Sequence, residues 1–313
     1  MMRILLLLAL VVQAAGAISP PSQNLRRLPL QKKRITLKSP TNYIHRILRY
    51  DSKTSEPVYY DPKPRVVLLD SKSGKYGLRW IGYDGKEKEI IYLLPNAINV
   101  VVIASVSKSP SGDYVYLYNL QNLPSSGQNL AFFSIQTFAS DVRPIPIGKG
   151  YVGQMTRHVE EFRNGNWIGF GSSNFIRSVI PGGGVELKLV SPSPPGVVEC
   201  RVAGGKLGMK GVGEEPPQEL ENVLPGYEAW PSGYTIGPVD ELRNYSATQL
   251  AQYIRERLPR FRQLGWISSN LLPLYEQNLT GERIENLYRR LDRDLKSGNI
   301  TTEVFAIVRS MKK

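Results

Sequence analysis

The spacing of apolar and polar residues changes twice along the chain. From Arg65 to about residue 203 the apolar residues recur with the period of two that is typical of β-strands. Gly, Pro and Asp mark the turns, and Tyr83-Asp84-Gly85-Lys86 carries the Asp-Gly pair that favours a tight hairpin. With no helical pattern between the strands, this region predicts an antiparallel β-sandwich. The strands expected are 65–70, 76–81, 89–94, 98–105, 113–121, 130–138, 151–160, 166–170, 185–190 and 197–202.

Beyond about residue 240 the period becomes that of amphipathic helices. Ser246 and Gln249 have the spacing of a capping box at the start of the first helix. Pro259 is expected to kink that helix or to begin a new one. Further helices are expected near 270–278, from Thr280 to Gly298, and from Thr301 or Thr302 onward. The C-terminal segment therefore predicts a small antiparallel helical bundle.

The first residues have the pattern of a secretory signal. Arg3 supplies a positive charge, residues 4–12 are an unbroken apolar run, and Ala15-Gly16-Ala17 fits the small-x-small cleavage site. An uncleaved signal anchor is the alternative. We expect export to the periplasm or the exterior, cleavage after about Ala17, and no transmembrane helix in the mature chain, because no later apolar run approaches the length of about 20 residues that a span needs.

The net charge of +13 is concentrated near the N-terminus. Residues 18–65 contain eleven basic and three acidic residues, whereas residues 66–239 contain fifteen of each. This distribution predicts a basic, flexible arm that contacts anionic surfaces or serves only as a solvated linker. No specific nucleic-acid recognition is expected, because no such motif follows the arm. The candidate contacts are Arg26, Arg27, Lys32, Lys33 and Arg34.

These patterns divide the chain into five predicted segments. They are a signal peptide at 1–17, the basic arm at 18–64, the β-sandwich at 65–203, a linker at 204–239 and a small helical domain at 240–313. The linker is predicted because 204–234 is rich in Gly, Pro and Glu and lacks periodicity.

Two sets of strand and turn motifs resemble a known kind of protein. The first is Tyr114-x-Tyr116-x-Tyr118-Asn119, which leads through Ser125-Ser126 to Leu130 and Phe132-Phe133. The second comprises Ile180-Pro181-Gly182, Leu187-x-Leu189-x-Ser191 and Pro195-Gly196-Val197-Val198. Together they resemble exported bacterial proteins, most of them uncharacterised, that have an immunoglobulin-like β-sandwich and a C-terminal helical tail. The resemblance implies a mainly β fold, an immunoglobulin-like antiparallel β-sandwich followed by a small all-α helical bundle, and it carries over no catalytic residue.

Candidate catalytic and metal-binding residues are scarce. Cys200 is the sole cysteine, so no intramolecular disulfide forms, and the alternation around it predicts a buried thiol. His45 and His158 are the two histidines, and neither lies in a zinc-binding motif. The segment from Gly169 to Ser173 approaches but does not match the Gly-x-Ser-x-Gly signature of serine hydrolases. No cofactor and no metal site are expected.

The row Tyr114, Tyr116 and Tyr118 is the one candidate ligand site in the β region. Exposed aromatic faces stack on sugar rings, so the row predicts a carbohydrate platform if it is turned outward. The same row could instead pack the sandwich, because tyrosine is common in strands. The alternation itself does not decide between these alternatives.

We therefore expect an exported, non-catalytic binding or structural module of the bacterial envelope or exterior. Its partner would be an envelope polymer or another exported protein. One alternative is a secreted hydrolase that acts on polysaccharide through a carboxylate pair not identifiable from spacing. A second alternative is an electrostatic tether to anionic surfaces through the basic arm.

Overall fold

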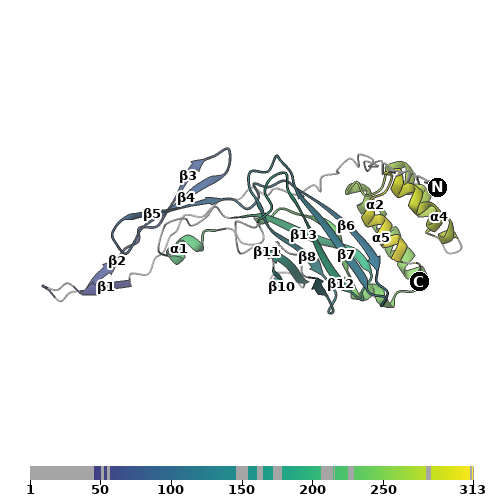
Figure 1. Ribbon diagram of the computed structural model, residues 1–313, viewed down its shortest axis with the longest axis horizontal. Coiled ribbons are helices and arrows are strands. Elements are labelled where there is room, and N and C mark those ends of the chain that lie inside the picture. The colour runs from purple at the N-terminus through teal and green to yellow at the C-terminus, as the bar shows by residue number, and fades with distance from the viewer. Residues whose placement is uncertain are drawn as a thin grey trace, which may run out of the picture.

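A computed structural model describes residues 46–50, 53–54, 57–145, 154–160, 165–171, 178–205, 214, 216–224, 229–279, 283–310 and 312. The predicted signal and the first part of the predicted arm lie outside these residues. Figure 1 shows an elongated molecule, with small sheets at one end, a β-sandwich in the middle and helices at the other end. No helix among the described residues is long and apolar enough to cross a membrane.

The sandwich is built from β6 to β14, which pair only in antiparallel fashion within its two sheets. The strands are β6 (Val100–Lys108), β7 (Tyr114–Asn122), β8 (Leu130–Thr137), β9 (Arg143–Ile145), β10 (Gln154–Glu160), β11 (Gly165–Gly171), β12 (Gly184–Ser191), β13 (Pro195–Gly204) and β14 (Ser232–Pro238). One sheet has the order β10-β11-β8-β13-β14 and the other has the order β6-β7-β12-β9.

The core lies between these two sheets and follows the alternation of each strand. On β7, the side chains of Tyr116, Tyr118 and Leu120 are buried, while Asn119 is exposed. The ring of Tyr118 meets the ring of Phe133 on β8, with 5.6 Å between their centroids. Side chains from both sheets thus fill one apolar layer, as expected for a sandwich.

Three predicted strands form a separate small sheet instead of joining the sandwich. They are β3 (Arg65–Asp70), β4 (Lys75–Ile81) and β5 (Glu87–Leu93), in the order β3-β4-β5. One face of this sheet buries Leu78 and Trp80 against Leu220 of helix α1 (Gln218–Glu221). The sheet has its own apolar partner in α1, so its strands need no place in the sandwich core.

Local sequence explains the hairpins at this end of the molecule. Gly85 adopts a φ of 76° in the turn between β4 and β5, as the predicted Asp-Gly hairpin requires. The strands β1 (Arg46–Tyr50) and β2 (Pro57–Tyr60) pair antiparallel. This hairpin falls inside the segment for which the sequence predicts a flexible arm.

The C-terminal helices form as predicted, with small differences at their ends. They are η3 (Asp240–Asn244), α2 (Ala247–Gln263), η4 (Ser269–Leu271), α3 (Leu272–Asn278), α4 (Ile284–Lys296) and α5 (Thr302–Ser310). The capping box of Ser246 and Gln249 is confirmed at the start of α2. Pro259 lies inside α2, which continues to Gln263 without starting a new helix.

The helices and the sandwich share one apolar cluster. Leu258, Leu291 and Val304 of the helices belong to the same group of packed side chains as the sandwich core. Helix α5 lies against β6 and also contacts β13 and β14. Strand β14 falls within the segment 204–239 that the sequence marks as a linker, and it pairs with β13 along seven residues. The predicted fold class, an antiparallel β-sandwich followed by helices, is confirmed.

Candidate functional site

The tyrosine row on β7 points into the sandwich core. Tyr116 and Tyr118 are fully buried. The Tyr116 hydroxyl donates to the carbonyl oxygen of Ser193 at 2.6 Å, and the Tyr118 hydroxyl donates to that of Ile236 at 2.9 Å. Burial raises the pKa of both phenols well above the ordinary value. These two hydroxyls therefore connect β7 to the β12–β13 turn and to the opposite sheet.

Tyr114, the third member of the row, is half-buried beside the same core. The ammonium of Lys108 lies 5.2 Å from the centroid of its ring. A carbohydrate platform needs exposed aromatic faces, and Tyr116 and Tyr118 have none. The platform prediction is therefore wrong for these two residues: alternation placed the three rings on one face without showing that this face is turned inward.

The sequence also predicts five contact residues in the basic arm. All five lie outside the described residues, namely Arg26, Arg27, Lys32, Lys33 and Arg34. Their role in binding anionic surfaces stays a prediction.

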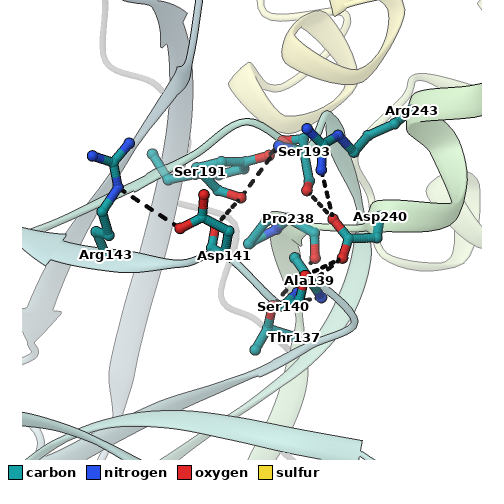
Figure 2. Close-up of polar contacts among 11 residues, drawn as sticks. Thr137, Ala139, Ser140, Asp141, Arg143, Ser191, Ser193, Pro238, Asp240 and Arg243 are labelled. Atoms are coloured by element: carbon teal, nitrogen blue, oxygen red, sulfur yellow. Dashed lines mark hydrogen bonds and ion pairs between the residues drawn. The ribbon is translucent and has the colours of Figure 1, made fainter.

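A polar cluster around Asp240 joins three connections at the end of the sandwich near the helices (Figure 2). One carboxylate oxygen of Asp240 accepts from the backbone amide and the hydroxyl of Ser140, each at 2.9 Å. The other accepts from the Ser193 hydroxyl and lies 3.6 Å from the Arg243 guanidinium. Asp240 thus links the β8–β9 loop and the β12–β13 turn to the first turn of η3.

The neighbouring contacts in this cluster also bind chain segments together. The Ser191 hydroxyl donates to the carbonyl oxygen of Asp141 at 2.8 Å and accepts from the amide of Ser193 at 3.2 Å. Arg143 lies between two carboxylates, 2.8 Å from Asp113 and 3.8 Å from Asp141. This arrangement orders the loops at this end of the sandwich.

The chemistry of the Asp240 cluster indicates a structural role rather than a role in proton transfer. The hydrogen bond from Ser193 is the largest cause that lowers the pKa of Asp240, followed by the amide of Ser140. A carboxylate with a lowered pKa is a weak general base. None of the residues labelled in Figure 2 is a histidine or lysine that could take up the serine proton. Ser193 is therefore held as a hydrogen-bond donor rather than activated as a nucleophile.

Two pairs of carboxylates among the described residues have an arginine between them. Arg143 lies between Asp113 and Asp141, and Arg79 lies between Glu87 and Glu89. A glycoside hydrolase needs one carboxylic acid with a raised pKa that faces the substrate. In both pairs the guanidinium lies between the carboxylates and forms an ion pair with each of them.

Glu303, in the first turn of α5, is a buried carboxyl at the contact between the helices and the sandwich. One of its oxygens accepts from the backbone amide of Ala104 on the edge strand β6, at 2.9 Å. Burial is the largest cause that raises the pKa of Glu303. Its position beneath α5 keeps it away from any polymeric substrate, so we assign it to the docking of the helix.

Cys200 is fully buried, as the sequence predicts. Burial raises the pKa of its thiol to about 12, so the reactive thiolate is scarce at neutral pH. Among the described residues, no group of three or more His, Cys, Asp or Glu side chains could hold a metal ion.

An apolar sheet edge is exposed at the end of the molecule far from the helices. Strand β3 is the outer strand of the small sheet and pairs with β4 alone among the described residues. Its Leu68 is 53% exposed and its Leu69 is 37% exposed. Open strand edges with apolar side chains are surfaces on which other strands can pair.

Comparison with known proteins finds solved structures of low similarity. No protein-family model matches the sequence, and no curated protein matches it. An uncharacterised protein from Nocardia farcinica, described as having an immunoglobulin-like fold, aligns with 42% of this chain and 94% of its own at 12% identity and a TM-score of 0.24. A non-cellulosomal cohesin from the archaeon Archaeoglobus fulgidus aligns with 35% of this chain and 83% of its own at 15% identity and a TM-score of 0.21.

Sequence reasoning missed the features that the structure brings forward. Asp240, Glu303 and the β3 edge gain their roles from contacts between segments far apart in sequence, which spacing does not reveal. One signal was present for β3. Its four central residues, Val66 to Leu69, are all apolar and do not alternate with polar residues, so both faces of the strand carry apolar side chains. Unless such a strand is buried on both faces, apolar side chains on one face stay exposed.

Proposed function

We propose that the protein is an exported, non-catalytic module that binds another protein or an envelope polymer in the periplasm or outside the cell. The contact surface in this proposal is the outer edge of the small sheet, formed by β3. The observation that carries the proposal is the exposure of Leu68 and Leu69 on a strand that, within the described part of the chain, pairs on one side alone.

The internal contacts of the molecule are those of a rigid scaffold that carries this surface. The buried hydroxyls of Tyr116 and Tyr118 join the two halves of the sandwich, and Glu303 fixes α5 to the strand edge of β6. These contacts make the middle of the molecule a continuous body with the helices. The small sheet, which has a separate core, lies at the opposite end from the helices (Figure 1).

Site-directed photo-crosslinking tests the proposed contact surface. A benzophenone amino acid replaces Leu68 in one variant and Ile180 in a matched control, because Ile180 is an apolar residue with 63% exposure on the sandwich. We expect a covalent adduct with a protein or a polymer from position 68 in cells that produce the protein, and none from position 180. Equal labelling at both positions, or none at position 68, overturns the proposed surface.

The net charge of +8 in residues 18–65 favours a second candidate function, a tether to anionic polymers. A variant in which the five candidate arm residues are changed to glutamine separates the two functions. If the arm is the tether, co-sedimentation with anionic cell-wall polymer falls steeply with salt and is lost in this variant. Binding that withstands both changes belongs to the folded part of the chain.

A further inference from the structure

We propose that β3 pairs antiparallel with β3 of a second copy of this chain, so that two small sheets join into one six-stranded sheet. This inference rests on the proposed function, since it names the partner of the same surface. The pairing uses a twofold axis through Val67, perpendicular to the sheet. Such an interface presents the same patch on both subunits, as is usual for homodimers.

Three other described sheet edges, those of β6, β9 and β5, are each protected against strand pairing. The backbone of β6 is covered by α5, whose Glu303 accepts from the Ala104 amide. Strand β9 has three residues, including Arg143 and Pro144, and proline lacks the amide that a strand ladder needs. Strand β5 begins with three charged residues, from Glu87 to Glu89, and charge discourages edge pairing. Strand β3 has no charge between its two ends.

The register of β3 against β4 shows which of its residues share a face. Val66 and Leu68 lie opposite Leu78 and Tyr76, on the side that α1 covers. Arg65, Val67 and Asp70 lie opposite Arg79, Gly77 and Lys75, on the other side. The register shifts between Leu68 and Asp70, so Leu69 is the extra residue of a bulge and Asp70 returns to the face of Arg65.

This pattern makes β3 complementary to itself. A twofold axis at Val67 sets this residue opposite the partner's Val67. The same axis sets Val66 opposite the partner's Leu68, on the other face of the sheet. Residues directly opposite in an antiparallel pair must share a face, and every one of these pairs does. The exposed Leu68 of each subunit then covers apolar surface of the other.

The two ends of β3 carry opposite charges that match in the same register. Arg65 is set against the partner's bulge at Leu69 and Asp70, where its guanidinium can pair with the Asp70 carboxylate, and this pair occurs twice in the dimer. The Arg65 side chain is 58% exposed, although it also contacts Glu87. The hydrogen bond from Ser73 is the largest cause that lowers the pKa of Asp70, so its carboxylate is ionised at neutral pH. A parallel pairing would set Arg65 beside the partner's Arg65, which favours the antiparallel arrangement.

The size of the contact sets the expected affinity. Stable interfaces bury roughly 1,200–2,000 Å². One pair of six-residue strands is smaller than that, so we expect a dissociation constant in the range of roughly 10–100 µM. The dimer should form at the high local concentrations of an envelope and dissociate on dilution.

Sedimentation velocity over a concentration series tests the dimer with the purified protein. We expect the monomer mass at about 1 µM and a rising share of dimer toward several hundred micromolar, given the affinity expected above. Leu68→Lys should weaken dimerisation at least tenfold, because it puts a charge on the open edge. The control Ile180→Lys introduces the same charge at another exposed position and should leave dimerisation unchanged. A monomer at every concentration overturns the proposal.

A cysteine at the twofold axis tests the register. Native Cys200 is fully buried, so in Val67→Cys the new thiol is the accessible one. Two such thiols face each other across the proposed axis within reach of a disulfide. Mild oxidation should therefore give a covalent dimer of Val67→Cys and no excess dimer of the control Ile180→Cys. Equal yields from both variants overturn the register, and folding of each variant is checked by circular dichroism.

The experiments distinguish a failure of the proposed contact surface from a failure of the proposed dimer. If the protein stays monomeric but position 68 still crosslinks to another molecule, the second copy is excluded and the contact surface stands. If the dimer forms and position 68 crosslinks only to the same chain, the dimer stands and the role in binding a different partner fails.

Discussion

Glu303 sits at the point where the helical segment meets the edge of the sandwich. Its carboxyl is buried and accepts from the Ala104 amide, and burial raises its pKa. In the unfolded chain its pKa returns to about 4.3. The folded state therefore binds the proton more tightly, and the contribution of Glu303 to stability is fully present below that value. This contribution is lost as the pH rises through the raised pKa of the folded state.

Glu303→Gln tests this pH dependence. The amide oxygen of glutamine still accepts from Ala104, but the buried negative charge is gone. We expect the variant to be more stable than wild type at pH 8, by on the order of 1 kcal/mol, and to lose this advantage near pH 4. Urea unfolding at several pH values gives the comparison. A constant difference between the two proteins from pH 4 to pH 8 contradicts the assignment.

Asp240 shows the opposite dependence. Its pKa is lowered mainly by the hydrogen bond from Ser193, so its contribution to stability is present above the unfolded pKa of about 3.9 and is lost as the pH falls through the lowered value. Asp240→Asn removes the charge and one acceptor. The partly exposed site limits the effect, and we expect a loss of about 1 kcal/mol at pH 7 that shrinks below pH 3. An equal loss at both pH values in urea unfolding would show that charge is not involved.

At the scale of single elements, β7 is held to the opposite sheet by a buried hydroxyl. Tyr118→Phe leaves the carbonyl oxygen of Ile236 without this donor inside the core. We expect a loss of about 1–2 kcal/mol in the free energy of unfolding. Tyr114→Phe is the matched control in the same strand, and its effect should stay within about 0.5 kcal/mol because Tyr114 is half-buried. Equal effects of the two changes would contradict the role given to Tyr118.

The contact between β13 and the helical segment depends on a glycine. A Cβ atom at Gly196 would lie 2.6 Å from the side chain of Val239 and 2.9 Å from the hydroxyl of Tyr253. Gly196→Ala should therefore push this side of the helical segment away from the sheet and cost about 1–3 kcal/mol. Chemical denaturation measures the loss, and a stability equal to wild type would show that the packing there is loose.

Elements with strong local signals are those that the sequence predicted well. The Asp-Gly turn at Gly85 and the capping box at Ser246 depend on neighbours within a few residues, and both are present. Strand β14 was missed because its central residues, Gly233 to Gly237, contain two glycines and show little alternation. The strand forms because it pairs with β13, although its local strand propensity is low.

The candidate site was harder to predict than the fold, for a physical reason. A strand pattern shows which residues share a face, but the partner that covers the face is set by the rest of the chain. For this reason the sequence did not show that the tyrosine row faces inward or that Leu68 is exposed. Asp240 and Ser140 are a hundred residues apart, so their contact follows from topology alone.

At the scale of the whole molecule, the chain has a firmly packed part and an exposed end. The sandwich and the helices share one apolar cluster, whereas the small sheet has a core of its own. The small sheet lies at the end of the elongated molecule away from the helices (Figure 1). This arrangement suits a module that is built on the sandwich and makes its contacts through β3.

Hydrogen–deuterium exchange as a function of protein concentration tests this account most directly. It needs no substitution, and it reports on the backbone amides of β3. We expect peptides that cover residues 65–70 to exchange several times more slowly at a few hundred micromolar than at one micromolar, given a dissociation constant of roughly 10–100 µM. Peptides that cover 178–183 should exchange equally at both concentrations. Identical exchange of residues 65–70 at the two concentrations would contradict the pairing of β3 with a second copy.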